Sequence, residues 1–199
     1  MSNVDGRQVL DLVALSRLSL VQRRLVWRLT RIKAVMLMLK QIVISDYPAP
    51  AALANIRANA QGAIPDDLRS LYSIEGHEWG NLDSSFAVNH ANYFDRILAA
   101  DCFWMPSQHL NLARSMLHFL TMDPGGRVFA VAGFHTGRAK LAAFFHVAQG
   151  EGLEIDEIFE EDADGVRRQW TSSRDDGKED DLIARKRWLV IARLKRRIV

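Results

Sequence analysis

The sequence contains a single cysteine, Cys102, among 199 residues. One cysteine cannot form an internal disulfide or a cysteine-based zinc cluster, and this scarcity favours a reducing, cytoplasmic environment. No apolar run reaches the roughly 18 residues that a membrane span requires, and Asp5 and Asp11 stand where a secretory signal would be basic. We therefore expect a soluble, cytoplasmic protein without a membrane partner.

The chain also lacks a strong net charge. Its 26 basic and 24 acidic residues give a formal charge of +2, which provides no general attraction to nucleic acid. Basic residues gather at 193–197, but the acids at 175–181 balance them, so we expect a solvated face there. The length and the apolar fraction of 48% fit one globular domain across residues 1–199.

Apolar, β-branched runs alternate with helical patterns along the chain. RQVLDLV, QIVISD, ILAA and VFAVAG predict strands, and the longer segments between them include helical patterns. This alternation is typical of βαβ units, so we expect an α/β fold with a doubly wound, mostly parallel sheet. Two further strands, LEIDEIFEED and RKRWLVIARLKRR, have no helix-length segment between them and predict a C-terminal antiparallel hairpin.

Glycine is absent between Gly6 and Gly62. Folds that bind nucleosides usually run from the first strand into a glycine-rich turn, because glycine lets the backbone approach the ligand and adopt positive φ. Here VLDL at 9–12 is followed by a basic stretch with apolar residues at helical spacing. We interpret it as an amphipathic crossover helix, the alternative being a membrane-surface, calmodulin-like or mitochondrial-targeting segment. The apolar positions are Leu18, Val21, Leu25, Leu29, Ile32, Val35 and Leu39.

Asp46 ends the second predicted strand and is followed by Pro48 and Pro50. In nucleoside-binding folds the second strand ends in an acid whose carboxylate accepts the ribose hydroxyl protons. The alternative is a helix N-cap or a turn aspartate, which the two prolines support. Asp46 is therefore a candidate ribose ligand.

Four stretches in order make a more specific pattern than any single motif: ISDYPAPAALANIRAN, EGHEWGNL, FDRILAADCFWMPSQH and VAGFHTGR. Together they resemble the fungal nicotinamide N-methyltransferase-like proteins. That group is a branch of the class I S-adenosylmethionine (SAM) methyltransferases that includes the N-terminal and lysine methyltransferase of translation elongation factor 1A. The resemblance covers residues 41–197 and implies a Rossmann-like seven-strand sheet, SAM as cofactor and methyl transfer to an amine. Residues 41–199 would form the family-like core and residues 1–40 a divergent N-terminal part.

Carried over to this chain, the resemblance assigns Asp46 to the ribose of SAM, Trp79 to the adenine and Ala100 to the floor of the cofactor site. An indole can stack on adenine and shield it from water. Trp79 could instead be a core tryptophan under a loop. The flanking Gly76 and Gly80 favour the functional interpretation, since they allow close backbone approach.

Asp101, Phe103 and Trp104 follow the fourth strand, at the edge from which a methyl acceptor would approach. An acid and aromatic faces can hold a cationic amine, and aromatic walls disfavour its charged form. The alternatives are a helix-capping role for Asp101 and plain packing for Phe103 and Trp104.

The stretch FHTGR follows the fifth strand, so His135 and Arg138 are candidates to border the acceptor cleft. The alternative is a turn in which Thr136 caps the next helix. His77 and Glu78 have no second histidine at helical spacing, so we treat them as structural or loop-ordering residues and expect no metal site.

The leading interpretation is a methyltransferase that acts on a protein amine, such as that of elongation factor 1A, with nicotinamide as the second choice of acceptor. A catalytically inactive methyltransferase-fold binding module is the main alternative, because the glycine-rich turn is missing. A nicotinamide-dinucleotide oxidoreductase also uses a strand-end acid, but GHEWG and FHTGR do not support it. The resemblance resumes abruptly at Gln41, which favours an altered N-terminal region, such as a retained intron or a frameshift.

Overall fold

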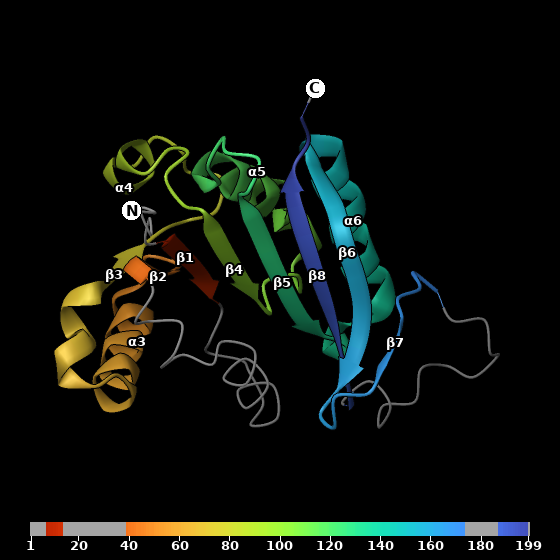
Figure 1. Ribbon diagram of the computed structural model, residues 1–199, viewed down its shortest axis with the longest axis horizontal. Coiled ribbons are helices and arrows are strands. Elements are labelled where there is room, and N and C mark those ends of the chain that lie inside the picture. Colours follow the sequence, from red (N-terminus) through yellow and green to blue (C-terminus); the bar gives the residue numbers. More distant parts are fainter. Residues whose placement is uncertain (1–6, 14–38, 174–186, 199) are drawn as a thin grey trace, which may run out of the picture.

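The computed structural model describes residues 7–13, 39–173 and 187–198, which form one mixed sheet with helices packed on it (Figure 1). The strands are β1 (Arg7–Val13), β2 (Leu39–Asp46), β3 (Tyr72–Gly76), β4 (Arg96–Ala100), β5 (Arg127–Gly133), β6 (Leu153–Asp162), β7 (Arg167–Gln169) and β8 (Trp188–Arg196). Their order in the sheet is β3-β2-β1-β4-β5-β8-β6-β7. The first five strands run parallel, and β8 is antiparallel to both β5 and β6. The predicted doubly wound, mostly parallel α/β fold is confirmed.

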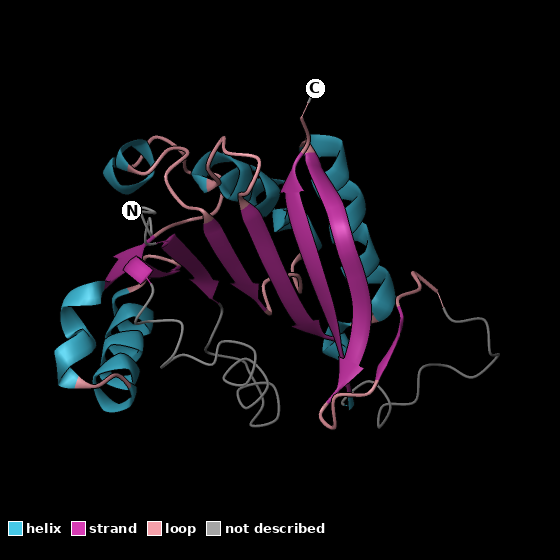
Figure 2. Cartoon of the chain, viewed as in Figure 1, coloured by secondary structure: helices cyan, strands magenta, loops and turns pink. Residues whose placement is uncertain are grey.

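Helices and single helical turns connect these strands. They are α3 (Pro50–Ala63), η2 (Asp66–Leu71), α4 (Ser85–Asn89), η3 (Pro106–Gln108), α5 (His109–Phe119), η4 (Phe134–Thr136) and α6 (Arg138–Glu151). The crossover through α3 leads from β2 outward to β3, and the crossover through α5 leads from β4 outward to β5 on the other side of β1. Because such crossovers are right-handed, α3 and α5 belong on opposite faces. Figure 2 shows α5 and α6 together behind β5, β8 and β6.

The main core lies between the sheet and the helices α5 and α6. Ile97, Val128 and Leu194 are buried between more exposed residues on their strands. They belong to the same buried cluster as Leu112 and Met116 of α5. Small strand residues leave room for large rings, which is how two packed layers fill space at interior density. The small residues are Ala99, Ala130, Ala132 and Ala192, and the rings are those of Phe119, Phe144 and Phe145.

The predicted C-terminal hairpin pairs β6 with β8, but the sheet has one strand more than expected. The short strand β7 pairs with the outer edge of β6, where Glu160 lies opposite Arg168. Its sequence, RRQ, has no apolar residue, so no hydrophobic pattern could reveal it. The sequence pattern also gave no location for β3 and α4, which are only five residues each.

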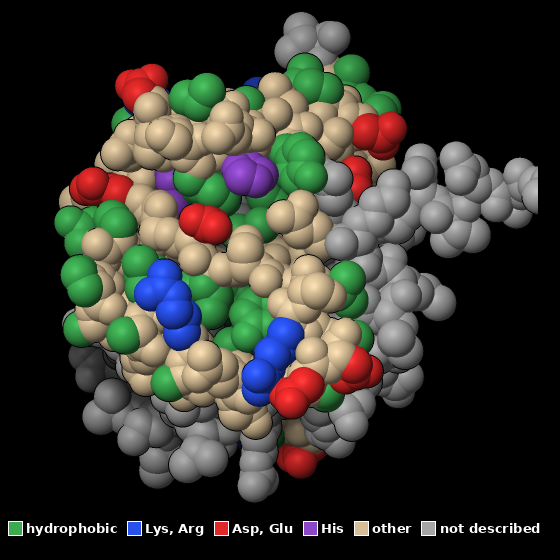
Figure 3. Space-filling model, turned by 90° about the vertical axis from the view of Figure 1, so that its left-hand side faces the viewer, with side chains coloured by type: hydrophobic (Ala, Val, Ile, Leu, Met, Phe, Trp, Pro, Cys, Tyr) green, Lys and Arg blue, Asp and Glu red, His purple; other side chains and the backbone are tan. Residues whose placement is uncertain are grey.

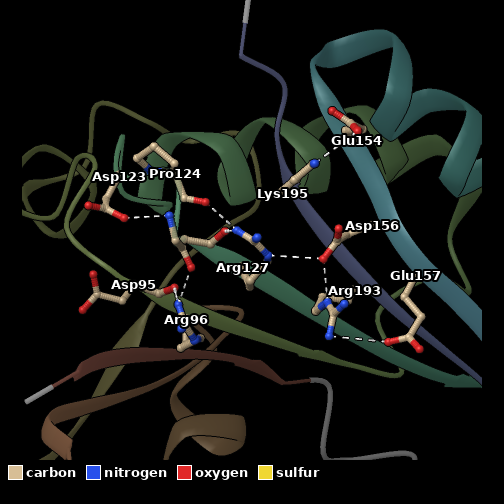
Figure 4. Close-up of polar contacts among 12 residues, drawn as sticks. Asp95, Arg96, Asp123, Pro124, Arg127, Glu154, Asp156, Glu157, Arg193 and Lys195 are labelled. Carbon is tan, nitrogen blue, oxygen red and sulfur yellow. Dashed lines mark hydrogen bonds and ion pairs between the residues drawn. The ribbon is translucent and has the colours of Figure 1, made fainter.

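Two basic residues of β8, Arg193 and Lys195, are paired with acids of β6 on the sheet face opposite α5 and α6 (Figure 4). Arg193 Nε lies 2.7 Å from Asp156 Oδ2, and Lys195 Nζ lies 3.3 Å from Glu154 Oε1. The Arg193 hydrogen bond lowers the pKa of Asp156. Such exposed pairs add less than about 1 kcal/mol each. They neutralise these two basic side chains locally with acids of β6. The acids at 175–181, which were expected to balance the basic strand, lie outside the described residues.

The surface at the β3 end of the molecule carries interspersed hydrophobic, basic and acidic side chains (Figure 3). Within residues 7–13, 39–173 and 187–198, no helix has both the length and the apolar character that crossing a bilayer requires. The amphipathic stretch predicted over residues 18–39 falls almost wholly outside the described residues.

Candidate functional site

The order of the strands reverses between β1 and β4, and this point locates the site. In open parallel sheets, ligands bind beyond the carboxyl ends of the strands where the order reverses. Asp46 ends β2, Ala100 ends β4 and Gly133 ends β5. The predicted cofactor and acceptor residues therefore lie along one edge of the sheet, around the carboxyl end of β1.

Asp46 is half-buried at the start of a turn. Its Oδ1 accepts a hydrogen bond of 2.7 Å from the backbone N–H of Tyr47, so it does act as a turn aspartate. It does not cap α3, because Ala49 is the N-cap and no side chain bonds there. Burial raises the pKa of Asp46, and the smaller effect of the Tyr47 hydrogen bond opposes that shift. A half-buried carboxylate with weakened solvation is well suited to accept hydroxyl protons from a ligand.

The turn after Asp46 packs directly on the start of the GHEWG loop. Asp46 and Gly76 are register partners, and the N–H of His77 donates to the carbonyl of Asp46 at 2.9 Å. A Cβ added to Gly76 would lie 2.9 Å from Pro48 Cβ, so a side chain there would push the two segments apart. This close approach holds the turn after Asp46 against the start of the loop that carries Trp79.

Trp79 lies in the loop after β3, half-buried, with its ring packed against the main core. The next residue, Gly80, has φ +85°, and a Cβ there would lie 2.7 Å from Asn111 Cγ of α5. The loop is therefore pressed against α5 in a conformation that requires glycine. The backbone at Gly80 therefore approaches α5 closely. This geometry is compatible with both interpretations of Trp79, an adenine ligand and a core tryptophan.

Replacing Gly80 with alanine should destabilise the protein by about 1–3 kcal/mol, since the substitution combines an unfavourable positive φ with a clash against Asn111. The free energy of unfolding in urea measures this loss. Gly62→Ala is the matched control: Gly62 lies in α3 with no atom near its added Cβ, so that variant should be as stable as the wild type or slightly more stable. Equal stabilities for both variants would contradict the strain at Gly80.

The candidate acceptor edge begins at Ala100 and Asp101. Ala100 is fully buried, and Asp101 is 2% exposed with φ +56°, a left-handed conformation that is costly for a residue with a side chain. The N–H of Asp101 donates to Val131 O of β5 at 2.7 Å, which holds the chain as it leaves the strand. The N-cap of the following helix α5 is Gln108, so Asp101 does not cap it.

Phe103 and Trp104 differ in their surroundings. Phe103 is fully buried, and its ring centroid lies 4.2 Å from that of Phe144, which supports plain packing for this residue. His109 Nε2 lies 2.9 Å from the carbonyl of Phe103 and fixes the turn between β4 and α5. Trp104 is only half-buried, so it remains a candidate to face an acceptor.

The FHTGR segment corrects one expectation. Arg138 does not border an open cleft: its Nη1 lies 2.5 Å from Glu160 Oε1, and the guanidinium lies 4.2 Å from the centre of the Phe134 ring. Gly137 precedes α6 with φ +95°, and Thr136 makes no capping bond to the helix. His135 belongs to η4, but its side chain lies outside what the structure describes, so its role stays a prediction.

His77 and Ser115 form a buried contact that the sequence did not suggest. The Nε2 atom of His77 lies 3.0 Å from Ser115 Oγ, and the same oxygen accepts a hydrogen bond of 2.9 Å from Gly80 N. His77 is 2% exposed and Ser115 is fully buried. These contacts agree with a structural role for His77, and the described residues contain no group of three potential ligands that could hold a metal ion.

The free energy of unfolding should decrease as the pH is lowered, because of His77. Burial, with a smaller effect from the charge of His118, lowers the pKa of His77 from 6.5 to about 4. Between these values the unfolded chain binds a proton that the folded chain does not, so the free energy of unfolding should decrease by up to about 1.4 kcal/mol per pH unit. Urea unfolding between pH 7 and pH 4 tests this. His77→Gln should be less pH-dependent than the wild type, and identical slopes would contradict the assignment.

Comparison with known proteins gives relatives over part of the chain. No family model matches the sequence. It is 33% identical over 141 residues to the protein N-terminal and lysine N-methyltransferase EFM7 of Yarrowia lipolytica, covering 61% of this chain and 50% of the relative. The protein of the same name from Schizosaccharomyces pombe is 29% identical over 130 residues, covering 61% of this chain and 49% of the relative. The chain thus spans about half the length of these curated relatives.

Solved structures share the fold at low sequence identity. The glycopeptide N-methyltransferase MtfA matches with a TM-score of 0.59 at 11% identity, covering 96% of this chain and 83% of that one. A SAM-dependent methyltransferase from Aquifex aeolicus gives 0.56 at 9% identity, covering 95% and 82%. The [4+2]-cyclase SpnF gives 0.60 at 13% identity, covering 98% and 76%, so this fold also hosts other chemistry. The resemblance is confirmed: the chain has the fold seen in SAM-dependent methyltransferases, and 61% of its length is similar in sequence to the fungal protein N-terminal and lysine N-methyltransferases.

Proposed function

We propose that this chain carries the core of a SAM-dependent N-methyltransferase that acts on a protein amine. One observation carries the proposal. The residues that the family resemblance assigns to the cofactor, Asp46, Trp79 and Ala100, lie on neighbouring elements around the point where the strand order reverses. The names of the curated relatives support a protein lysine or N-terminus as the acceptor over nicotinamide.

The described residues fit the adenosine part of SAM. The carboxylate of Asp46 would accept the ribose hydroxyl protons, and the indole of Trp79 would stack on the adenine. Ala100, which is fully buried at the end of β4, would form the floor of this site. Bound SAM would supply an activated methyl group, and the protein would mainly align the acceptor with it.

Asp101 and Trp104 are the residues that we assign to the acceptor. A buried carboxylate attracts a protonated amine, and an aromatic face adds a cation–π contact. Desolvation beside these side chains also favours the neutral amine, which is the form that reacts. No nucleophilic side chain or metal ion is needed for this transfer. We keep translation elongation factor 1A as the proposed substrate on the basis of the family resemblance.

Transfer of a labelled methyl group tests the activity. The chain is incubated with tritiated SAM and purified elongation factor 1A, and Asp101→Asn is the matched acceptor-side variant. We expect label on a lysine or the N-terminal amine of the substrate, with a rate about 10 to 100 times lower for the variant. Nicotinamide in place of the protein tests the second acceptor.

A catalytically inactive binding module is the second candidate. The observation in its favour is the missing glycine-rich turn after VLDL, because that turn normally lets the backbone approach the cofactor. This alternative predicts no transfer to either acceptor, whereas the methyltransferase proposal predicts transfer that depends on Asp101.

A further inference from the structure

The loop that carries Trp79 is tied to helix α5 by one buried hydroxyl. Ser115 Oγ lies 3.0 Å from His77 Nε2 and accepts a hydrogen bond of 2.9 Å from Gly80 N. These two contacts lie on either side of Trp79 in the sequence. The bonded residues are 38 and 35 positions apart in the sequence, so these contacts join the loop to a helix that is distant along the chain.

The anchor on α5 is rigid. Asn111 and Ser115 are four residues apart and therefore lie on one face of the helix. Asn111 packs so close to Gly80 that no side chain fits there, and Ser115 is fully buried in the middle of α5. A helix held by main-chain bonds and core packing moves less than a loop, so the loop takes its position from α5.

The imidazole of His77 is also fixed in place. Its centroid lies 4.8 Å from that of the Phe119 ring, which it meets edge-on, and 6.0 Å from that of Phe86. Among the described residues its Nδ1 is buried without a hydrogen-bond partner, which costs about 1–3 kcal/mol. An apolar side chain would avoid that cost but could not bond to Ser115. The favourable polar contact of this ring is therefore the one at Nε2.

We propose that His77 and Ser115 are positioning residues that hold Trp79 where it can stack on the adenine of SAM. This inference rests on the proposed function, because that function assigns Trp79 to the adenine. His77 touches neither the cofactor nor the acceptor in this account. It acts through the loop, by fixing the backbone on the N-terminal side of Trp79 while Gly80 is fixed on the other side.

Two amide variants of His77 give a matched test. Glutamine can bring a polar atom to the place of Nε2, whereas asparagine is too short to reach Ser115. We expect His77→Asn and Ser115→Ala to raise the KM for SAM and the Kd for S-adenosylhomocysteine about tenfold, the size of a lost stacking contact. The kcat should change less than twofold, and His77→Gln should restore most of the affinity.

A double-mutant comparison separates positioning from general damage. In a Trp79→Ala background, His77→Asn should cause no further loss of S-adenosylhomocysteine affinity, because the residue through which it acts is gone. A further tenfold loss in that background would overturn the proposal. So would a fall in kcat without a rise in KM, or equal effects of His77→Gln and His77→Asn.

A second measurement needs no cofactor and remains informative even if the wild type does not bind SAM. Acrylamide quenching of tryptophan fluorescence, compared with Trp79→Phe, reports how accessible the Trp79 indole is. His77→Asn and Ser115→Ala should increase this accessibility, and His77→Gln should not. Unchanged quenching in all three variants would show that these residues do not position Trp79, whereas failure of the wild type to bind would count against the proposed function alone.

Discussion

Replacing Asp46 with asparagine should weaken the binding of S-adenosylhomocysteine by at least about 100-fold. The substitution keeps the shape of the side chain but removes its charge, and the two ribose hydroxyls would lose charge-assisted hydrogen bonds worth about 1.5–3 kcal/mol each. Since every 1.4 kcal/mol is about tenfold in affinity, even part of this loss gives two orders of magnitude. Equilibrium dialysis with labelled ligand measures the change.

The matched control is Asp67→Asn, which makes the same chemical change at an exposed position of η2, away from the carboxyl ends of the strands. It should bind as the wild type does. Because burial raises the pKa of Asp46, binding should also weaken as the pH falls through that raised value. If Asp46→Asn binds as tightly as Asp67→Asn, the ribose assignment is wrong.

Replacing Glu160 with glutamine should destabilise the protein by about 3–5 kcal/mol, the cost of leaving a buried charge without its partner. Glu160 is fully buried on β6 and accepts from Arg138 through both of its oxygens, at 2.5 and 3.2 Å. Arg168 Nε adds a third bond at 2.7 Å. Arg138 in turn donates to Thr171 O at 2.9 Å, so the pair connects α6 with β6 and with the chain beyond β7.

The unfolding midpoint and free energy in urea measure this effect. Glu154→Gln serves as the control, since Glu154 is on the same strand but its carboxylate is 48% exposed and pairs with Lys195. That change should cost less than about 1 kcal/mol. Similar losses for the two variants would mean that the buried pair contributes no more than a surface pair does.

The longer strands and the edge of the site could be predicted because both depend on local sequence, whereas the short strands β3 and β7 could not. Apolar runs such as QIVISD and VFAVAG are long enough to show a strand, and an acid directly after the second run must lie at the carboxyl end of the sheet. The predicted positions of Asp46 and Ala100 needed nothing more than the strand boundaries and the parallel arrangement.

The burial of Arg138 could not be predicted in the same way. Its partner lies on a strand with an irregular pairing register between Ile155 and Glu157, and such a bulge changes which side of the sheet the following residues face. After this bulge, Glu160 and Asp162 are fully buried although they are acids. A strict two-residue alternation starting from the buried Leu153 would have placed both side chains on the outer face of the sheet.

The contact between His77 and Ser115 could not be predicted from the sequence, for a different reason. The two residues are 38 positions apart, and each is unremarkable in its own segment. Only the packing of α5 against the loop after β3 brings them together. The prediction that His77 is a structural or loop-ordering residue agrees with its buried contacts, but the sequence does not show that its imidazole contacts Ser115.

Calorimetric titration of the wild-type chain with S-adenosylhomocysteine tests directly whether the chain binds the cofactor. We expect saturable one-to-one binding that is lost in Asp46→Asn and weakened in Trp79→Ala, because both side chains would contact the adenosine part of the ligand. Absence of saturable binding by a folded wild-type chain, or binding that neither substitution alters, would contradict this expectation.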